Sequence, residues 1–133
     1  MRKILLTLFV LTLSACTLLD AALMTKYDAV EYKIITDIRA ESFHAKSQCA
    51  DPVTSKTNAD RIAYQAALFE FYSEFIPHNT DMIRASKELN AIALGLRDRY
   101  KGDAVSATFC KIKFESIENS AMVIQKSIGA KPR

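Results

Sequence analysis

The chain has 133 residues, with 18 Lys and Arg against 15 Asp and Glu and a formal net charge of +3 at pH 7. Its hydrophobic content of 50% is enough for one domain with a real core. The basic residues form no dense stripe of the kind that binds phosphate backbones, which excludes nucleic acid as a partner.

The start of the chain has the organisation of a bacterial export signal. Two basic residues precede an apolar run over 4–13, and Ser14 and Ala15 then lead into Cys16. A run of this length is too short to span a bilayer. Its positive start, apolar centre and small-residue end are typical of a secretory signal.

The four residues Leu13-Ser14-Ala15-Cys16 resemble the lipobox of bacterial prolipoproteins, because each position holds a residue preferred in that family. The resemblance implies that the Cys16 sulfur takes a diacylglycerol, that the chain is cut just before Cys16, and that the new amino group is acylated. Membrane lipid is then a partner through the acyl anchor, and no cofactor other than this covalent lipid is expected. The alternative is an ordinary signal peptide followed by a coincidental cysteine.

On this interpretation residues 1–15 are the signal peptide, 16–19 are the lipidated cysteine with a short tether, and 20–133 form the domain. Loss of the two basic residues of the signal leaves 16 basic and 15 acidic residues, so the mature protein is nearly neutral. In lipoproteins of enteric bacteria, aspartate after the lipid cysteine signals retention in the inner membrane. Thr17 stands there instead, so the resemblance favours the outer membrane and a domain held close to it in the periplasm.

Helical periodicity recurs four times after the signal, whereas no segment alternates as a strand would. We expect helices over about 20–47, 59–76, 79–102 and 103–129, with a polar loop over 49–58 between the first two. Apolar residues that step by four or three mark the first helix: Leu23, Tyr27, Val30, Ile34 and Ile38. A longer seam of the same kind marks the fourth helix: Cys110, Phe114, Ile117, Ala121, Ile124 and Ile128.

Helix boundaries are indicated by proline, glycine and capping residues. Pro77 must end the second helix, Asn79 can begin the third, Gly102 stops it, and Asp103 can cap the fourth. Four helices with short connections predict an all-α, up-down-up-down four-helix bundle.

Two cysteines remain if Cys16 carries lipid, and they allow one pairing, Cys49 with Cys110. Exported proteins meet an oxidising environment, so we expect a disulfide rather than two separate buried thiols. In the predicted topology the end of the first helix and the start of the fourth lie at the same end of the bundle. The predicted topology therefore allows a disulfide between Cys49 and Cys110.

A metal site is the first chemistry to consider, because four-helix bundles host di-iron centres built from two Glu-x-x-His motifs and two further carboxylates. The chain has one such spacing, from Glu41 to His44, with Asp37 one turn earlier. The other histidine, His78, is expected at the opposite end of the bundle. Asp37, Glu41 and His44 are therefore weak metal candidates, and a solvated face is the favoured interpretation.

Motifs of the common catalytic classes do not occur in the sequence. It contains no Cys-x-x-Cys, no Cys-x-x-Cys-His, no Gly-x-Ser-x-Gly and no phosphate-binding glycine loop. We therefore expect a protein that is not an enzyme.

The second helix is apolar over about 200° of its circumference, whereas packing against a core needs a stripe of little more than about 100°. Its first side carries Ile62, Ala66, Phe69 and Ile76. The apolar arc continues well past these through Tyr64, Leu68, Phe71 and Phe75. The excess marks either a partner-binding surface or a helix that its neighbours bury on most sides.

These observations leave three functional hypotheses. The first is a membrane-anchored envelope lipoprotein that binds another envelope protein in the same membrane as a non-catalytic interaction module. The second is a phage- or plasmid-encoded lipoprotein for superinfection exclusion or lysis. The third is a periplasmic small-ligand or metal-binding bundle that uses Asp37, Glu41 and His44. The C-terminal residues 131–133 are expected to form a solvated basic tail.

Overall fold

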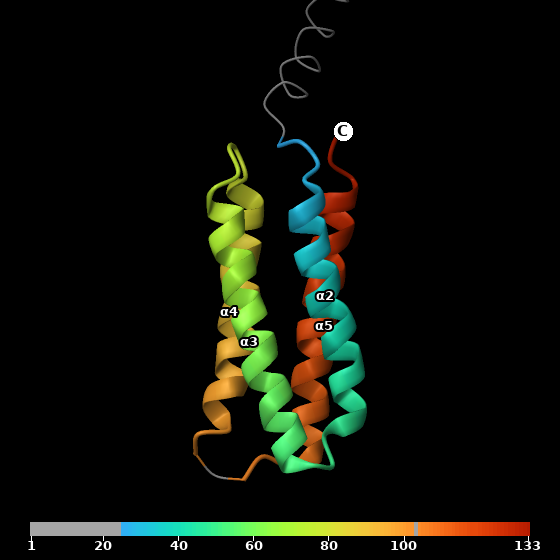
Figure 1. The fold of residues 1–133 in the computed structure, drawn as a ribbon, viewed down its shortest axis with the longest axis vertical. Helices are drawn as coiled ribbons and strands as arrows, with labels where there is room; N and C mark the ends of the chain where they lie inside the picture. Colours follow the sequence, from blue (N-terminus) through green and yellow to red (C-terminus); the bar gives the residue numbers. More distant parts are fainter. Residues whose placement is uncertain (1–24, 103) are drawn as a thin grey trace, which may run out of the picture.

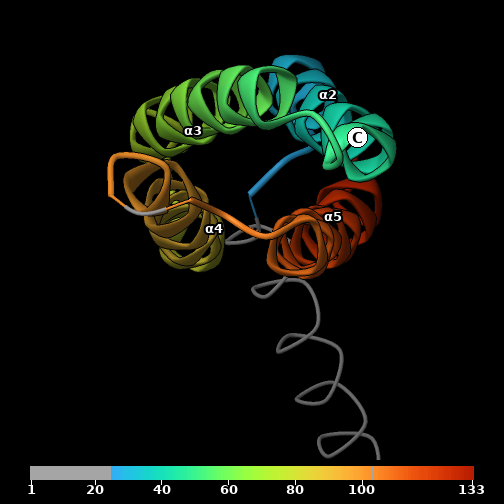
Figure 2. The same ribbon diagram turned by 90° about the horizontal axis from the view of Figure 1, so that it is seen from below.

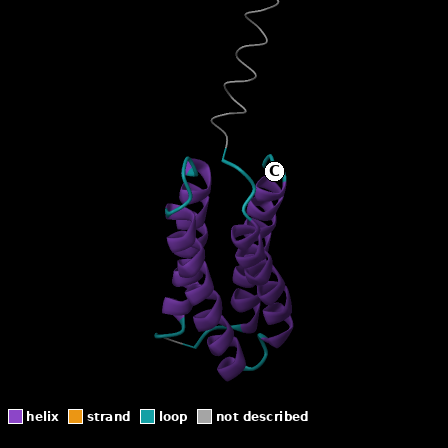
Figure 3. Ribbon diagram, turned by 45° about the horizontal axis from the view of Figure 1, so that its top comes forward, coloured by secondary structure: helices purple, strands orange, loops and turns teal. Residues whose placement is uncertain are grey.

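The computed structural model describes residues 25–102 and 104–133, which fold into four antiparallel helices (Figure 1). In chain order these are α2 (Ala29–Ala45), α3 (Pro52–Glu74), α4 (Thr80–Arg99) and α5 (Ala107–Gly129). A 3-10 turn, η1 (Lys46–Gln48), extends α2. All regular structure of the described residues is helical, as Figure 3 shows, so the predicted all-α four-helix bundle is confirmed.

The helices occupy the four corners of the bundle in chain order, as the view along its axis shows (Figure 2). Each helix packs against the next, and α5 closes the ring against α2. The first described residues, the turn between α3 and α4, and the C-terminus lie at one end, which we call the terminal end (Figure 1). The connections from α2 to α3 and from α4 to α5 lie at the other end. Among the described helices none is long and apolar enough to cross a membrane.

The core is a single apolar cluster between the four helices. The seam predicted for α5 is confirmed, since all six of its residues are buried: Cys110, Phe114, Ile117, Ala121, Ile124 and Ile128. The other helices contribute their largest buried apolar side chains to the same cluster: Ile35, Ile38, Ile62, Phe69, Leu89 and Leu96. Full burial of one such side chain favours folding by about 1.5–3 kcal/mol, so this cluster is the main source of stability.

The inward face of α2 is rotated relative to the face that we predicted. Its buried residues are Glu31, Ile35, Ile38, Ser42 and Ala45. Val30, which the predicted stripe placed in the core, is 50% exposed. The predicted stripe is confirmed at Ile38, and Tyr27 and Ile34 are partly buried against the core. The buried polar residues Glu31 and Ser42 were missed because the stripe was drawn through apolar residues alone.

The beginning of α2 also differs from the prediction, because residues 25–28 are not helical. Asp28 is the N-cap, and its Oδ1 accepts hydrogen bonds from the backbone N–H groups of Val30 and Glu31, each at 2.8 Å. These bonds satisfy donors that the first turn would leave free, which favours a start at Ala29. Residues 20–24 of the predicted helix lie outside the described residues.

The beginning of α3 was predicted seven residues too late, at 59 rather than Pro52. Proline suits the first position of a helix, where no N–H is needed, so Pro52 begins the helix rather than interrupting a loop. The carboxylate of Asp51 caps it and accepts hydrogen bonds from Thr54 Oγ1 and from the N–H of Val53. The bond from Thr54, together with that from Val53, lowers the pKa of the Asp51 carboxyl group.

The fourth predicted helix begins at Ala107 rather than at residue 103. Ser106 is its N-cap, since the Ser106 Oγ accepts a hydrogen bond of 3.2 Å from the N–H of Phe109. Asp103, which we predicted as the cap, lies outside the described residues.

A disulfide joins Cys49 to Cys110, as the sequence predicted, with an S–S distance of 1.95 Å and a Cα–Cα distance of 5.7 Å. Both cysteines are buried. The bond links the segment after α2 to the start of α5 at the end of the bundle opposite the terminal end. It therefore joins two positions of the chain that are 61 residues apart in the sequence.

Candidate interaction surface

Helix α3 packs into the bundle through one seam, which we call the inner seam. Its residues step by four, three and four: Ile62, Ala66, Phe69 and Ser73. All four side chains are buried. This spacing follows the 3.6-residue turn and keeps one side of the helix against the core.

A second seam with the same steps runs along α3 two residues further on, and we call it the outer seam. Its residues and their exposed fractions are Tyr64 (69%), Leu68 (44%), Phe71 (66%) and Phe75 (85%). A shift of two residues is about 200° around a helix, so the outer seam lies opposite the inner one and points away from the core. The described part of the chain does not cover it, which decides against a helix buried on most sides.

Polar side chains between the outer seam and α2 are hydrogen-bonded to α2 or to its N-cap, Asp28. Glu41 accepts hydrogen bonds from Arg61 Nε at 2.7 Å and from Gln65 Nε2 at 2.9 Å. Further along, the Tyr72 hydroxyl donates to the Asp28 carboxylate at 3.2 Å. Because these side chains turn toward α2, they leave the outer seam as the outermost ridge of α3.

The Asp28 contact and the burial around it alter the acidity of Tyr72. Partial removal from water disfavours the phenolate and raises the pKa of Tyr72, and the negative charge of Asp28 raises this pKa further. The phenol therefore stays protonated over the neutral range and can keep donating to Asp28. This hydrogen bond holds the Tyr72 ring beside the outer seam.

On the opposite flank, the polar side chains of α3 are bound to α4. Glu70 accepts a hydrogen bond of 2.6 Å from Asn90 Nδ2, and Glu74 forms an ion pair of 3.1 Å with Lys87. The polar side chains on both flanks are thus bound to neighbouring segments, and the apolar outer seam is exposed to solvent between them. An exposed apolar stripe with polar borders is characteristic of a surface that binds another molecule.

Comparison of the chain with protein-family models, with curated proteins and with solved structures finds no match. The outer seam is therefore interpreted from its own geometry and chemistry.

The weak metal candidates are engaged in other contacts. Asp37 pairs with Lys33 at 2.6 Å, and Glu41 binds Arg61 and Gln65 as described above. His44 is exposed near the end of α2, where its ring packs edge-on against Phe43. Within the described residues no group of three or more His, Cys, Asp or Glu side chains is arranged to hold a metal ion.

The terminal end contains a buried polar cluster that the sequence did not lead us to expect. The Glu31 carboxylate is fully buried, and it accepts hydrogen bonds from Ser73 Oγ at 3.1 Å and from Asn79 Nδ2 at 2.7 Å. Lys131 Nζ completes the cluster, at 2.9 Å from Glu31 Oε2 and 2.9 Å from Asn79 Oδ1. Glu31, Ser73, Asn79 and Lys131, which we call the terminal cluster, connect α2 and α3 with the N-cap of α4 and with the segment that follows α5.

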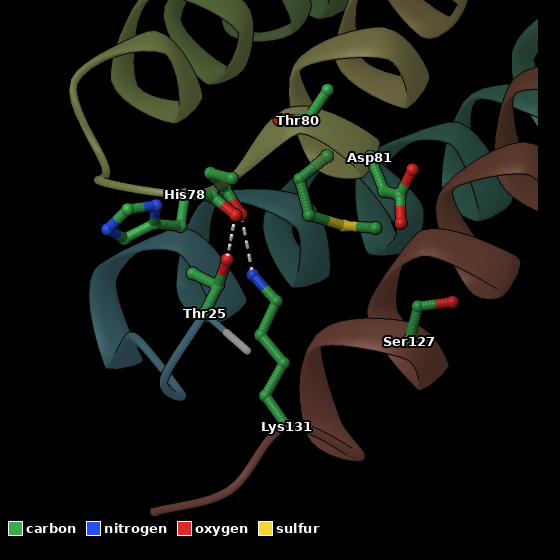
Figure 4. A pocket seen from close by; sticks show the side chains of 8 residues that line it. Thr25, His78, Thr80, Asp81, Ser127 and Lys131 are labelled. Carbon is green, nitrogen blue, oxygen red and sulfur yellow. Dashed lines mark hydrogen bonds between the residues drawn. The ribbon is translucent and has the colours of Figure 1, made fainter. Parts of the chain in front are cut away.

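A pocket of about 540 Å³ lies beside the terminal cluster, and Lys131 extends along it from the end of α5 toward the start of α4 (Figure 4). Thr25 closes one side by donating from its hydroxyl to the carbonyl oxygen of His78. Thr80, Asp81 and Ser127 line the rest. The charge of Lys131 is already neutralised by Glu31, so this pocket is a junction between chain segments rather than a basis for assigning a ligand.

The expectation of a solvated C-terminal tail is wrong for Lys131, whereas Pro132 and Arg133 are exposed but held in place by contacts. Besides the Lys131 contacts, the backbone carbonyl of Pro132 accepts a hydrogen bond of 2.8 Å from the N–H of Tyr27. The Arg133 guanidinium lies over the Tyr27 ring, 5.5 Å from its centre. The end of the chain is thus fastened to the segment that leads into α2.

Proposed function

We propose that the protein is a membrane-anchored lipoprotein of the bacterial cell envelope and acts as a non-catalytic interaction module. The lipid is carried by Cys16, and Thr17 favours the outer membrane. The outer seam of α3 is the surface that binds a helical partner at the same membrane.

The observation that carries this proposal is the likeness between the two seams of α3. The inner seam packs against helices of the bundle, and the outer seam repeats its spacing with Tyr64, Leu68, Phe71 and Phe75. Residues at this spacing fit the grooves of a facing helix. Three of the four are aromatic, and buried Tyr and Phe side chains are strong anchors at protein interfaces.

The position of the outer seam supports a partner near the membrane. The described chain begins at Thr25, at the terminal end, and α3 also ends there, so Phe75 is the seam residue nearest the anchor (Figure 1). The nine residues from Cys16 to Thr25 span at most about 30 Å when extended. A lipid on Cys16 would therefore keep Phe75 close to the bilayer surface.

Photo-crosslinking in cells tests the interaction. Replacement of Phe71 by benzoylphenylalanine should give, after irradiation, a covalent product with a polypeptide. The matched control is benzoylphenylalanine at Val123, which is 61% exposed on α5 and outside the outer seam. A polypeptide captured from position 71 but not from 123 is expected. Equal capture from both positions, or none from 71, would overturn the proposed binding surface.

The anchor is tested by the intact mass of the protein extracted from cell envelopes without reductant. We expect a chain that begins at Cys16, carries acyl groups, and has the mass of the disulfide form. A Cys16→Ser variant should lose the lipid and leave the membrane fraction. A wild-type chain without acyl groups would contradict the proposed anchor.

A further inference from the structure

We infer that the partner of the outer seam is a second copy of this chain, with the two α3 helices side by side, parallel and in register. The inference rests on the proposed function, because it identifies the partner of the surface proposed above. Phe75 of one copy would then meet Phe75 of the other, and the same holds for Phe71, Leu68 and Tyr64.

The spacing of the outer seam is that of a two-stranded coiled coil. Tyr64 and Phe71 take one of the two core positions of the heptad, and Leu68 and Phe75 take the other. In a parallel pair each layer of such a core contains the same residue from both chains. A continuous ridge of apolar side chains, placed opposite the core, is therefore complementary to itself.

The residues beside the seam are compatible with a parallel pair. In a parallel pair, contacts across the seam would join Asp60 to Gln65 and Ala67 to Tyr72 of the other copy, and neither contact brings like charges together. In the antiparallel pair that aligns the seam with itself, Leu68 would face Phe71 and Tyr64 would face Phe75, and the contacts beside the seam would join Ala67 to Glu74 and Gln65 to Tyr72. Neither direction brings like charges together, so the flanks are compatible with both.

The position of the anchor favours the parallel direction. Both copies would be fastened to one membrane, and in each the chain enters the bundle at the terminal end (Figure 1). Two upright bundles related by an axis perpendicular to the membrane have parallel α3 helices. The pair can then form with both anchors on the same side and with Phe75 of each copy nearest the bilayer.

The area of the outer seam predicts a weak pair that the membrane strengthens. Burying the exposed parts of three aromatic rings and one leucine removes about 400–600 Å² per copy from water, as aromatic side chains offer roughly 150–250 Å² each. Two copies together reach about 1,000 Å², near the lower limit for a specific interface. Anchoring in one membrane raises the effective concentration of the copies, so a weak interface can still be occupied.

A lipid surface fits the outer seam less well. Glu70 and Glu74 border the seam on the side of α4. Their carboxylates would repel anionic headgroups, whereas membrane-surface helices usually carry Lys and Arg on their polar borders.

The test places benzoylphenylalanine at position 75 in the full-length protein in its membrane, and tandem mass spectrometry identifies the residue to which it attaches. We expect a product of twice the protein mass, linked around residues 71–75 of the second copy. In a Leu68→Glu background its yield should fall at least about tenfold, because a central anchor is lost. In a Val123→Ser background the yield should stay unchanged, and thermal unfolding should show both variants folded.

The other outcomes overturn the inference in different ways. Attachment near residue 64 of a second copy would contradict the parallel arrangement. Attachment only to a different polypeptide would overturn the second copy as partner and leave the proposed function standing. Attachment to lipid alone from positions 71 and 75 would overturn the inference and the proposed binding surface together.

Discussion

Lys131, two residues before the last residue of the chain, binds Glu31 across the terminal end, with 2.9 Å between the Lys131 Nζ and the Glu31 Oε2. The Glu31 side chain is fully buried and that of Lys131 is 10% exposed, so the pair is largely removed from water. Glu31 also accepts hydrogen bonds from Ser73 and Asn79. A buried carboxylate with three hydrogen-bond donors is well satisfied, and the stability of the folded protein depends on each donor.

Replacement of Lys131 by Met should therefore destabilise the protein strongly. It leaves the Glu31 carboxylate buried without its cation, a change that costs about 3–5 kcal/mol in comparable buried pairs. Chemical denaturation followed by circular dichroism measures the effect. The control is Lys126→Met, at an exposed position near the end of α5, which should change the free energy of unfolding by less than about 0.5 kcal/mol. A Lys131→Met variant as stable as this control would show that the pair contributes little.

The terminal cluster also shows why the sequence predicted the core of the bundle better than its ends. The α5 seam could be predicted because all of its positions are apolar, apart from the cysteine that the disulfide uses. Glu31 occupies an inward position at the same spacing as Ile35 and Ile38, but a charged residue is normally assigned to solvent. Glu31 can be buried only because hydrogen-bond partners that are distant in the sequence satisfy its carboxylate. One signal was available, namely that Glu31 continues the inward spacing of α2.

The candidate surface could be predicted in part. The apolar arc of α3 was visible in the sequence, and its excess was assigned to the side that the structure leaves exposed. Whether neighbouring helices would cover this side was left open, since both seams have the same spacing. The small side chains of Ala66 and Ser73 belong to the inner seam, where they let neighbouring helices approach, while the bulky Phe71 and Phe75 lie outside. Hydrophobicity alone would have favoured the opposite assignment, because the outer seam is the more aromatic of the two.

Reduction of the Cys49–Cys110 disulfide should lower stability without changing the fold. The bond closes a loop of 61 residues, for which the chain-entropy estimate is about 4 kcal/mol. The free energy of unfolding, measured with and without reductant, should differ by about this amount. A Cys49→Ala/Cys110→Ala variant should match the reduced protein and show no response to reductant. If reductant left the wild-type stability unchanged, the entropic contribution assigned to this bond would be wrong.

Tyr72 should make stability fall at alkaline pH. The partial burial of its hydroxyl, and then the nearby Asp28 charge, raise the pKa of Tyr72 in the folded state above the usual 10.0. The stabilisation is complete below about pH 10 and is lost as pH rises through the folded-state pKa, because the unfolded chain releases this proton first. In a titration followed by phenolate absorbance, the raised pKa of Tyr72 should give a late ionisation step, and Tyr72→Phe should remove that step. A titration in Tyr72→Phe that keeps the late step would assign it to another tyrosine.

The two seams of α3 should respond very differently to truncation. Phe69 is fully buried in the inner seam, and Phe69→Ala should cost about 3–5 kcal/mol because it leaves a cavity in the core. Phe71 is 66% exposed, so Phe71→Ala should change the free energy of unfolding of the dispersed monomer by less than about 0.5 kcal/mol. Denaturant unfolding of both variants in dilute detergent gives the comparison. A large loss in Phe71→Ala under these conditions would mean that the outer seam supports the fold itself, and the free surface on which the proposed function depends would not exist.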